Sequence, residues 1–156
     1  MKLLLFLLEL CQITLSNTQN SNVINAKITA QQNFEINQPA LLSIEITNNS
    51  EETVELLQWN TPLEGLHCKL LEITDSEGKQ IPYLGIIVKR GNPKPKHFMS
   101  IKAGEKVEVN LDFSEAYKIT SPGIHKIQLK FRTTLKHNKK SEMIYCESNI
   151  IDVNFK

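Results

Sequence analysis

The sequence lacks the short motifs on which most enzyme chemistry depends. Its 156 residues contain no His-Glu-x-x-His pair for zinc hydrolysis, no Gly-x-Ser-x-Gly elbow and no glycine loop that would cradle a phosphate. The four histidines are scattered, and no cysteine is accompanied by a base with an orienting partner. These absences predict a chain that is not an enzyme and needs no cofactor.

A metal site is not expected either. Glu64, His67 and Cys68 are close in sequence. However, consecutive residues of a strand point to opposite faces, so His67 and Cys68 cannot easily ligate one ion. His125 falls in a predicted strand beside Lys126 and is expected to be an exposed strand histidine rather than a ligand.

An excess of charge of either sign is missing too. The formal net charge is +1, so global charge gives no reason to expect nucleic acid or an anionic membrane as the main partner.

Long hydrophobic runs are absent. The longest apolar stretch covers residues 3–15 and is interrupted by Glu9, Gln12 and Thr14. It is shorter than the roughly 20 residues that a membrane-spanning helix needs. Lys2 precedes it and small polar residues follow, which predicts a signal peptide over residues 1–20 and one domain over residues 21–156. A buried first helix, or a lipoprotein anchor at Cys11, is the alternative.

Helical periodicity is also missing, and strand periodicity takes its place. Apolar residues alternate with polar ones over residues 24–30, 42–47 and 107–111, and most regularly over residues 127–131. Turn residues separate these segments. The pattern predicts an all-β fold, an immunoglobulin-like antiparallel β-sandwich of about seven to nine strands.

Three local features refine this prediction. Residues 68–74 are expected to form a strand, residues 75–78 a hairpin turn, and residues 81–88 the return strand, with Pro82 placing its start at an edge or bulge. Residues 113–118 are expected to hold one helical turn, capped by Ser114, with Tyr117 packing back on the core. Asn48 begins a glycosylation sequon.

Cysteine is scarce, at three residues. If Cys11 leaves with the leader, Cys68 and Cys146 remain as an even pair in an oxidising compartment. They form a disulfide or, alternatively, two buried free thiols.

Acidic residues are absent from residues 78–104, which carry six lysines and arginines. The centre of this stretch, residues 89–96, contains two prolines and predicts a stiff loop. The loop contacts an acidic protein surface or is merely solvated. Nucleic acid is not the expected partner, because no aromatic side chains interleave with the charges to stack bases. The basic candidates for binding are Lys89, Arg90, Lys94 and Lys96.

Another unusual loop covers residues 59–65. Trp59 precedes it, and proline and glycine bracket it. Trp59 belongs to the core or to a contact surface.

These loops resemble the N-terminal, non-catalytic domain of deuterolysin-like and peptidyl-Lys metalloendopeptidases. The resemblance lies in residues 57–65, 81–90 and 101–123, and it covers residues 24–133. It implies an immunoglobulin-like pro-segment or accessory domain, whereas the zinc protease domain of that family has no counterpart here. The positions that the resemblance adds as binding candidates are Asn60, Thr61, Pro62, Glu64, Gly65, Tyr83 and Gly85.

The combined features favour binding over catalysis. The first hypothesis is a secreted, periplasmic or cell-envelope module that engages a protein partner, a secreted zinc protease, as inhibitor, chaperone or accessory domain. No stable membrane insertion is expected after leader removal. The alternative is a structural or adhesive envelope domain with no protease partner.

Overall fold

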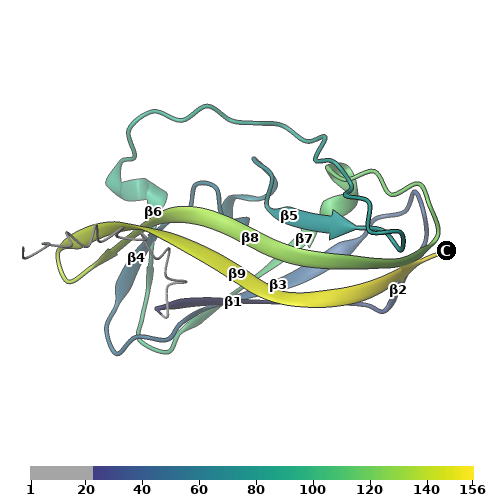
Figure 1. Cartoon of the computed structure of the whole chain (residues 1–156). Helices are drawn as coiled ribbons and strands as arrows, with labels where there is room; N and C mark the ends of the chain where they lie inside the picture. The colour runs from purple at the N-terminus through teal and green to yellow at the C-terminus, as the bar shows by residue number, and fades with distance from the viewer. Residues whose placement is uncertain (1–22) are drawn as a thin grey trace, which may run out of the picture.

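The computed structural model describes residues 23–156, so the predicted signal peptide lies outside the described part. Nine strands form two layers, with no α-helix among these residues (Figure 1). The predicted all-β sandwich is therefore confirmed. The described part also contains no helix that is long and apolar enough to cross a membrane. The strands are β1 (Ile24–Ala30), β2 (Asn33–Phe34), β3 (Leu41–Asn48), β4 (Val54–Leu57), β5 (Leu71–Thr74), β6 (Phe98–Ile101), β7 (Lys106–Asp112), β8 (Gly123–His137) and β9 (Lys140–Phe155).

The two layers differ in size. The smaller sheet is antiparallel, in the order β1-β3-β7. The larger sheet has the order β2-β9-β8-β4-β6, and β5 pairs with the first half of β8. The long strands β8 and β9 run side by side along the molecule (Figure 1). One long strand, β8, therefore supports both short strands β4 and β5.

Alternate side chains of each strand meet between the layers. Ile44 and Ile46 of β3 and Leu129 of β8 are fully buried. Phe34 is also buried and stacks on Phe155 with ring centroids 5.5 Å apart. Because each buried aliphatic side chain contributes about 1.5–3 kcal/mol, this alternation is the main source of stability.

The turn predicted near residue 113 forms as a short 3-10 helix, η3 (Phe113–Glu115), and Tyr117 packs back as expected. Asp112, rather than the predicted Ser114, is its cap. Oδ1 of Asp112 accepts hydrogen bonds from the N–H and hydroxyl of Ser114 and from the N–H of Ala40. Burial acts to raise the pKa of Asp112, but these hydrogen bonds outweigh it, and the pKa is lowered.

Tyr117 completes the hydrogen bonding of β5. The C=O of Leu70 accepts a bond from Lys130 of β8, so the polar groups of the next residue, Leu71, point away from β8. The hydroxyl of Tyr117 accepts from the N–H of Leu71 at 2.9 Å and donates to its C=O at 3.0 Å. Burial raises the pKa of Tyr117 to about 12, so the hydroxyl keeps the proton that it donates.

Residues 81–88 do not form the predicted return strand. After the turn at residues 75–78, pairing ends with one bridge between Thr74 and Gln80. Pro82 has no N–H with which to continue a ladder. The N–H of Leu84 bonds instead to the C=O of Ala116 at 2.8 Å. The chain therefore leaves the sheet and crosses the molecule as the long upper loop of Figure 1. The strand predicted over residues 68–74 begins only at Leu71.

His125 is fully buried, which corrects the prediction of an exposed side chain. It shares the inward parity of Ile127 and Leu129 on β8. Its ring contacts that of Phe155, and Nδ1–H donates to the C=O of Gly123 at 3.0 Å. Nε2 has no hydrogen-bond partner among the described residues.

Asn48 of the predicted sequon is fully buried. Its Nδ2 donates to the C=O groups of Glu52, Ile101 and Lys102 at 2.7 to 3.0 Å, and Oδ1 accepts from Ser50. A glycan on Nδ2 would break these bonds, so in the folded protein this side chain is a structural link between two turns.

Cys68 and Cys146 are free thiols, so the structure does not contain the disulfide that was one of the two alternatives. Cys68 is half-buried in the loop before β5. Cys146 is buried on β9, with Sγ 3.7 Å from the C=O of Ile24. Burial raises the pKa of Cys146 to about 12.

We expect Tyr117→Phe to lower the free energy of unfolding by about 1–3 kcal/mol, because two buried backbone groups of Leu71 lose their partner. Denaturant unfolding measures the change. Tyr145→Phe is the matched control, since that hydroxyl bonds only to Glu147 on the half-exposed face. Equal losses in the two variants would contradict the assigned role of Tyr117.

We expect iodoacetamide to alkylate both Cys68 and Cys146 when the purified protein is denatured without a reductant. Peptide mass mapping locates the added groups. Unmodified cysteines that become reactive only after reduction would show that a bridge forms in solution.

Candidate functional site

The two loops predicted as contact candidates lie against each other. In chain order, the first loop covers residues 59–65, and the second loop, which includes the predicted loop over residues 89–96, covers residues 83–96. The guanidinium of Arg90 donates to Oε2 of Glu64 at 2.6 Å, and its Nη2 lies 3.3 Å from Nδ1 of His67. The N–H of Val88 donates to the C=O of His67 at 3.3 Å. The side chain of Glu64 is only 12% exposed, so this ion pair is better shielded than an ordinary surface pair. The sequence named both residues as candidates, but only the fold joins them.

Trp59 packs against the second loop and stays partly exposed. The guanidinium carbon of Arg90 lies 5.3 Å from the Trp59 ring centroid, within the range of a cation–π contact. The ring of His97 packs on Trp59, with centroids 4.5 Å apart. His97 also accepts the N–H of Lys94 on Nδ1. Trp59 therefore supports the second loop more than it faces a partner.

The first loop is a rigid turn. Thr61 caps the 3-10 helix η1 (Pro62–Glu64), accepting the N–H of Leu63 while donating to the C=O of Gln58. Thr61 and Pro62 are buried. Asn60 and Gly65 enter and leave the turn with positive φ angles of 59° and 85°. Among the predicted residues of this loop, Asn60 alone is classed as exposed.

The second loop is fixed at its start by Tyr83. The hydroxyl of Tyr83 lies 2.7 Å from the C=O of Leu66 and 2.6 Å from the C=O of Ile86. The phenol lies so close to Gly85 that a Cβ there would come within 2.5 Å of the hydroxyl oxygen. Gly85 is thus required by a close approach, and the predicted residues Tyr83 and Gly85 shape the loop.

Beyond this support the loop is open to solvent. Lys89, Lys94 and Lys96 are exposed, and none of them forms an ion pair with a carboxylate in residues 23–156. The 3-10 helix η2 (Pro95–His97) closes the loop before β6.

Three exposed apolar residues of this loop were missed by the sequence prediction. Leu84, Ile86 and Ile87 are 65%, 61% and 79% exposed. The prediction assigned them to a strand, where half of them would be buried. Adjacent isoleucines at 86 and 87, after a proline and a glycine, were the signal that alternation had ended.

The chemistry of this region is that of a contact surface. Burial raises the pKa of Cys68, and the nearby Glu64 raises it further, against a smaller opposing effect of Arg90. The thiol therefore stays protonated and is a poor nucleophile. In the described part of the chain, no three His, Cys, Asp or Glu residues gather as metal ligands would.

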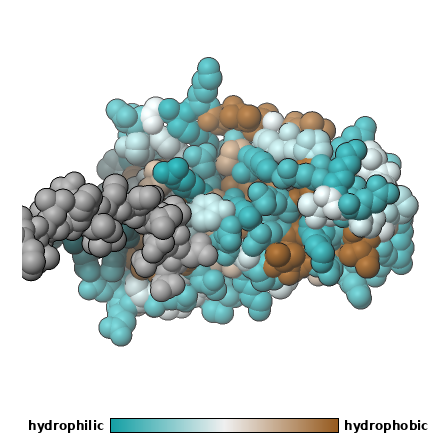
Figure 2. All heavy atoms as spheres, viewed as in Figure 1, coloured by the Kyte–Doolittle hydropathy of each residue, from teal (hydrophilic) through white to brown (hydrophobic). Residues whose placement is uncertain are grey.

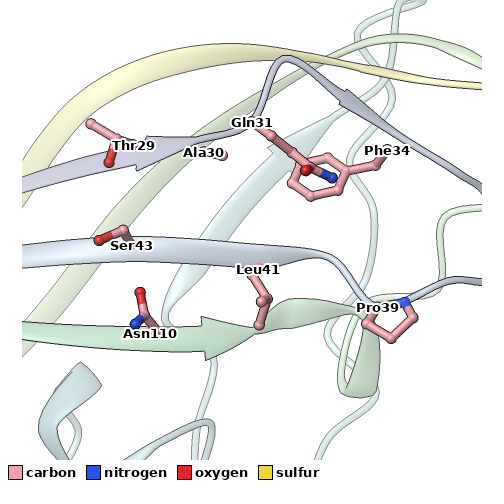
Figure 3. A pocket seen from close by; sticks show the side chains of 8 residues that line it. All are labelled: Thr29, Ala30, Gln31, Phe34, Pro39, Leu41, Ser43 and Asn110. Atoms are coloured by element: carbon pink, nitrogen blue, oxygen red, sulfur yellow. The ribbon is translucent and has the colours of Figure 1, made fainter.

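A separate hollow lies on the smaller sheet. Figure 3 shows Thr29, Ser43 and Asn110 along three strands, with Leu41 and Pro39 near one end. The hollow is wide open, and its lining has no titratable side chain. Its hydrogen-bonding side chains, those of Thr29, Gln31, Ser43 and Asn110, are neutral and line an open surface that would not enclose a ligand. The loop pair is therefore the stronger candidate.

We expect Arg90→Ala to speed amide hydrogen exchange at Val88 and its neighbours, because the loop loses its link to Glu64 and Trp59. The free energy of unfolding should change by less than about 1 kcal/mol. Hydrogen exchange with mass spectrometry measures the first effect. Lys126→Ala, which removes an exposed ion pair with Asp152, is the control and should leave the loop unchanged. Unaltered exchange at Val88 in Arg90→Ala would contradict the proposed link.

Known proteins similar to this chain are extracellular or neutral proteases. An extracellular protease of Aeromonas hydrophila is 27% identical over 65% of this chain and 29% of its own length. A probable neutral protease 2 homolog of Arthroderma otae is 23% identical over 67% of this chain and 27% of its own length. The chain thus spans less than a third of these relatives.

Fold comparison gives a weaker likeness. A CARDB domain from Pyrococcus furiosus is 10% identical, with a TM-score of 0.39, over 85% of this chain and 94% of that one. The model of the immunoglobulin-like domain family matches residues 26–144. Because this family model covers most of the chain, and because the two sheets form a sandwich, the chain belongs to the immunoglobulin-like domain family.

Proposed function

We propose that this chain is an exported, non-catalytic module that binds a secreted protease. The observation that carries the proposal is the loop over residues 83–96. Its base is fixed by Tyr83 and by the Arg90–Glu64 pair, while its lysines and apolar side chains face solvent. A loop held in place loses little conformational entropy on binding, which favours affinity.

The class of partner is suggested by the relatives. They are proteases, and the segments that match this chain make up less than a third of each. The resemblance to the non-catalytic domain of deuterolysin-like and peptidyl-Lys metalloendopeptidases agrees with this and suggests a zinc protease. The module would act on it as inhibitor, chaperone or accessory domain.

Export and lack of catalysis rest on separate arguments. The apolar segment over residues 3–15 has the length and flanking residues of a signal peptide, and one relative is named an extracellular protease. The candidate site supplies an ion pair, packed aromatic rings and a protonated thiol. A nucleophile with an activating base is not among them.

The test is capture of a protease from the organism's own secreted proteins. The purified protein is immobilised, and bound proteins are identified by mass spectrometry. A recovered protease is then purified and its Kd is measured directly. We expect a protease to be recovered and to bind again in purified form. Recovery of envelope components without a protease would contradict the proposal and favour a structural or adhesive role.

We expect Lys89→Glu, Lys94→Glu and Lys96→Glu together to weaken this binding, chiefly by slowing association. Charges at the rim of an interface steer encounter, and salt screens them. The loss should therefore shrink as ionic strength rises. The matched control reverses three lysines elsewhere on the surface, Lys27, Lys140 and Lys156. If both triple variants lose affinity equally, the effect comes from net charge and not from this loop.

A further inference from the structure

The loop displays a strip of three apolar side chains. Leu84, Ile86 and Ile87 lie within four consecutive residues and are the most exposed large hydrophobic residues of the described chain. Figure 2 shows hydrophobic surface gathered along the upper edge of the molecule, where Figure 1 draws the long loop. We call these three residues the apolar strip.

The backbone under the apolar strip is held on both sides. The N–H of Leu84 bonds to Ala116 at 2.8 Å, and the C=O of Ile86 accepts the hydroxyl of Tyr83 at 2.6 Å. The N–H of Val88 then bonds to His67. The strip therefore cannot fold back onto the core without breaking these bonds, and the fold keeps it facing solvent.

The charges that follow the strip along the chain have one sign. Residues 78–104 contain no Asp or Glu, and Lys89, Lys94 and Lys96 follow the strip along the loop as exposed cations. Arg90 is neutralised by Glu64. An apolar centre with a polar or charged rim is the usual composition of a protein-binding surface. A partner that complements the lysines at this rim would carry carboxylates opposite them.

We infer that the apolar strip is the centre of the interface with the protease and occupies an apolar groove bordered by Asp and Glu side chains. This inference rests on the proposed function. It differs from the sequence-based expectation, in which the lysines and the Trp59 loop made the contact. The lysines are the rim, Trp59 lies beneath the loop, and the isoleucines enter the partner.

An anionic membrane is the other surface that would attract apolar and basic side chains. A protein groove fits better, because membrane binding needs a broad apolar area or a dense cluster of cations, and here the strip has three residues and is followed by three exposed lysines. Fixed backbone hydrogen bonds also suit a shaped groove more than a fluid interface.

The experiment compares the protein with the combined variant Leu84→Ser, Ile86→Ser and Ile87→Ser. The probe is the secreted protease that the unmodified protein captures, and the Kd is measured by surface binding. We expect the Kd to rise by about 30-fold or more, because central apolar anchors carry most of the binding energy. The loss should persist at high salt, unlike that of the lysine variant.

The matched control removes three other exposed apolar side chains, with Ile124→Thr, Met143→Thr and Ile150→Thr; these residues are 55% to 58% exposed. Thermal unfolding checks that both variants fold. A normal Kd in the folded loop variant would overturn the inference while leaving the proposed function intact. Failure of the unmodified protein to bind any protease would instead reject the proposed function.

A second readout separates protein from membrane. The unmodified protein is mixed with vesicles of phosphatidylglycerol and phosphatidylcholine and sedimented. We expect it to remain in the supernatant. Sedimentation that the loop variant abolishes would overturn the inference in favour of a membrane surface.

Discussion

The hydroxyl of Tyr117, held between the N–H and C=O of Leu71, is the interaction on which the placement of the loops depends. β5 has four residues and one neighbouring strand, β8. Its other edge would bury unpaired backbone groups, which is costly in a protein interior. The turn that delivers Tyr117 also offers the C=O of Ala116 to Leu84, and the rings of Tyr83 and Tyr117 lie 5.4 Å apart. The turn that closes the free edge of β5 therefore also fixes the point at which the exposed loop leaves the core.

The two loops, residues 59–65 and residues 83–96, have different structural roles. The first, which contains η1, is a scaffold: Thr61 and Pro62 are buried, and Glu64 presents its carboxylate inward to Arg90. The second is the displayed element. Arg90 links the second loop to this scaffold through its contacts with Glu64 and Trp59. The neighbouring Lys89 is exposed to solvent. A charged residue in a basic loop is therefore not necessarily part of the contact surface.

Much of the sandwich could be predicted because alternation is a local property. Ile44 and Ile46, or Leu129 and Phe131, reveal their buried face without knowledge of the neighbouring strand. The same rule would have buried His125, but the polarity of the side chain outweighed its parity in the prediction. The prediction of a strand over residues 81–88 was wrong for another reason. Their apolar content is that of a strand, but after Pro82 the segment pairs with no strand and makes only single backbone bonds, to Ala116 and to His67.

By itself, the sequence determined the fold class, the inward faces of the strands, the turn that carries Tyr117 and the two loops worth attention. These follow from residue type and spacing along a few neighbouring positions. Only the tertiary structure decided that Arg90 meets Glu64, that Trp59 lies beneath the second loop and that Leu84, Ile86 and Ile87 face solvent. Exposure of an apolar side chain depends on what other segments leave uncovered, and segments 20 to 40 residues apart meet through long-range packing, which no local pattern encodes.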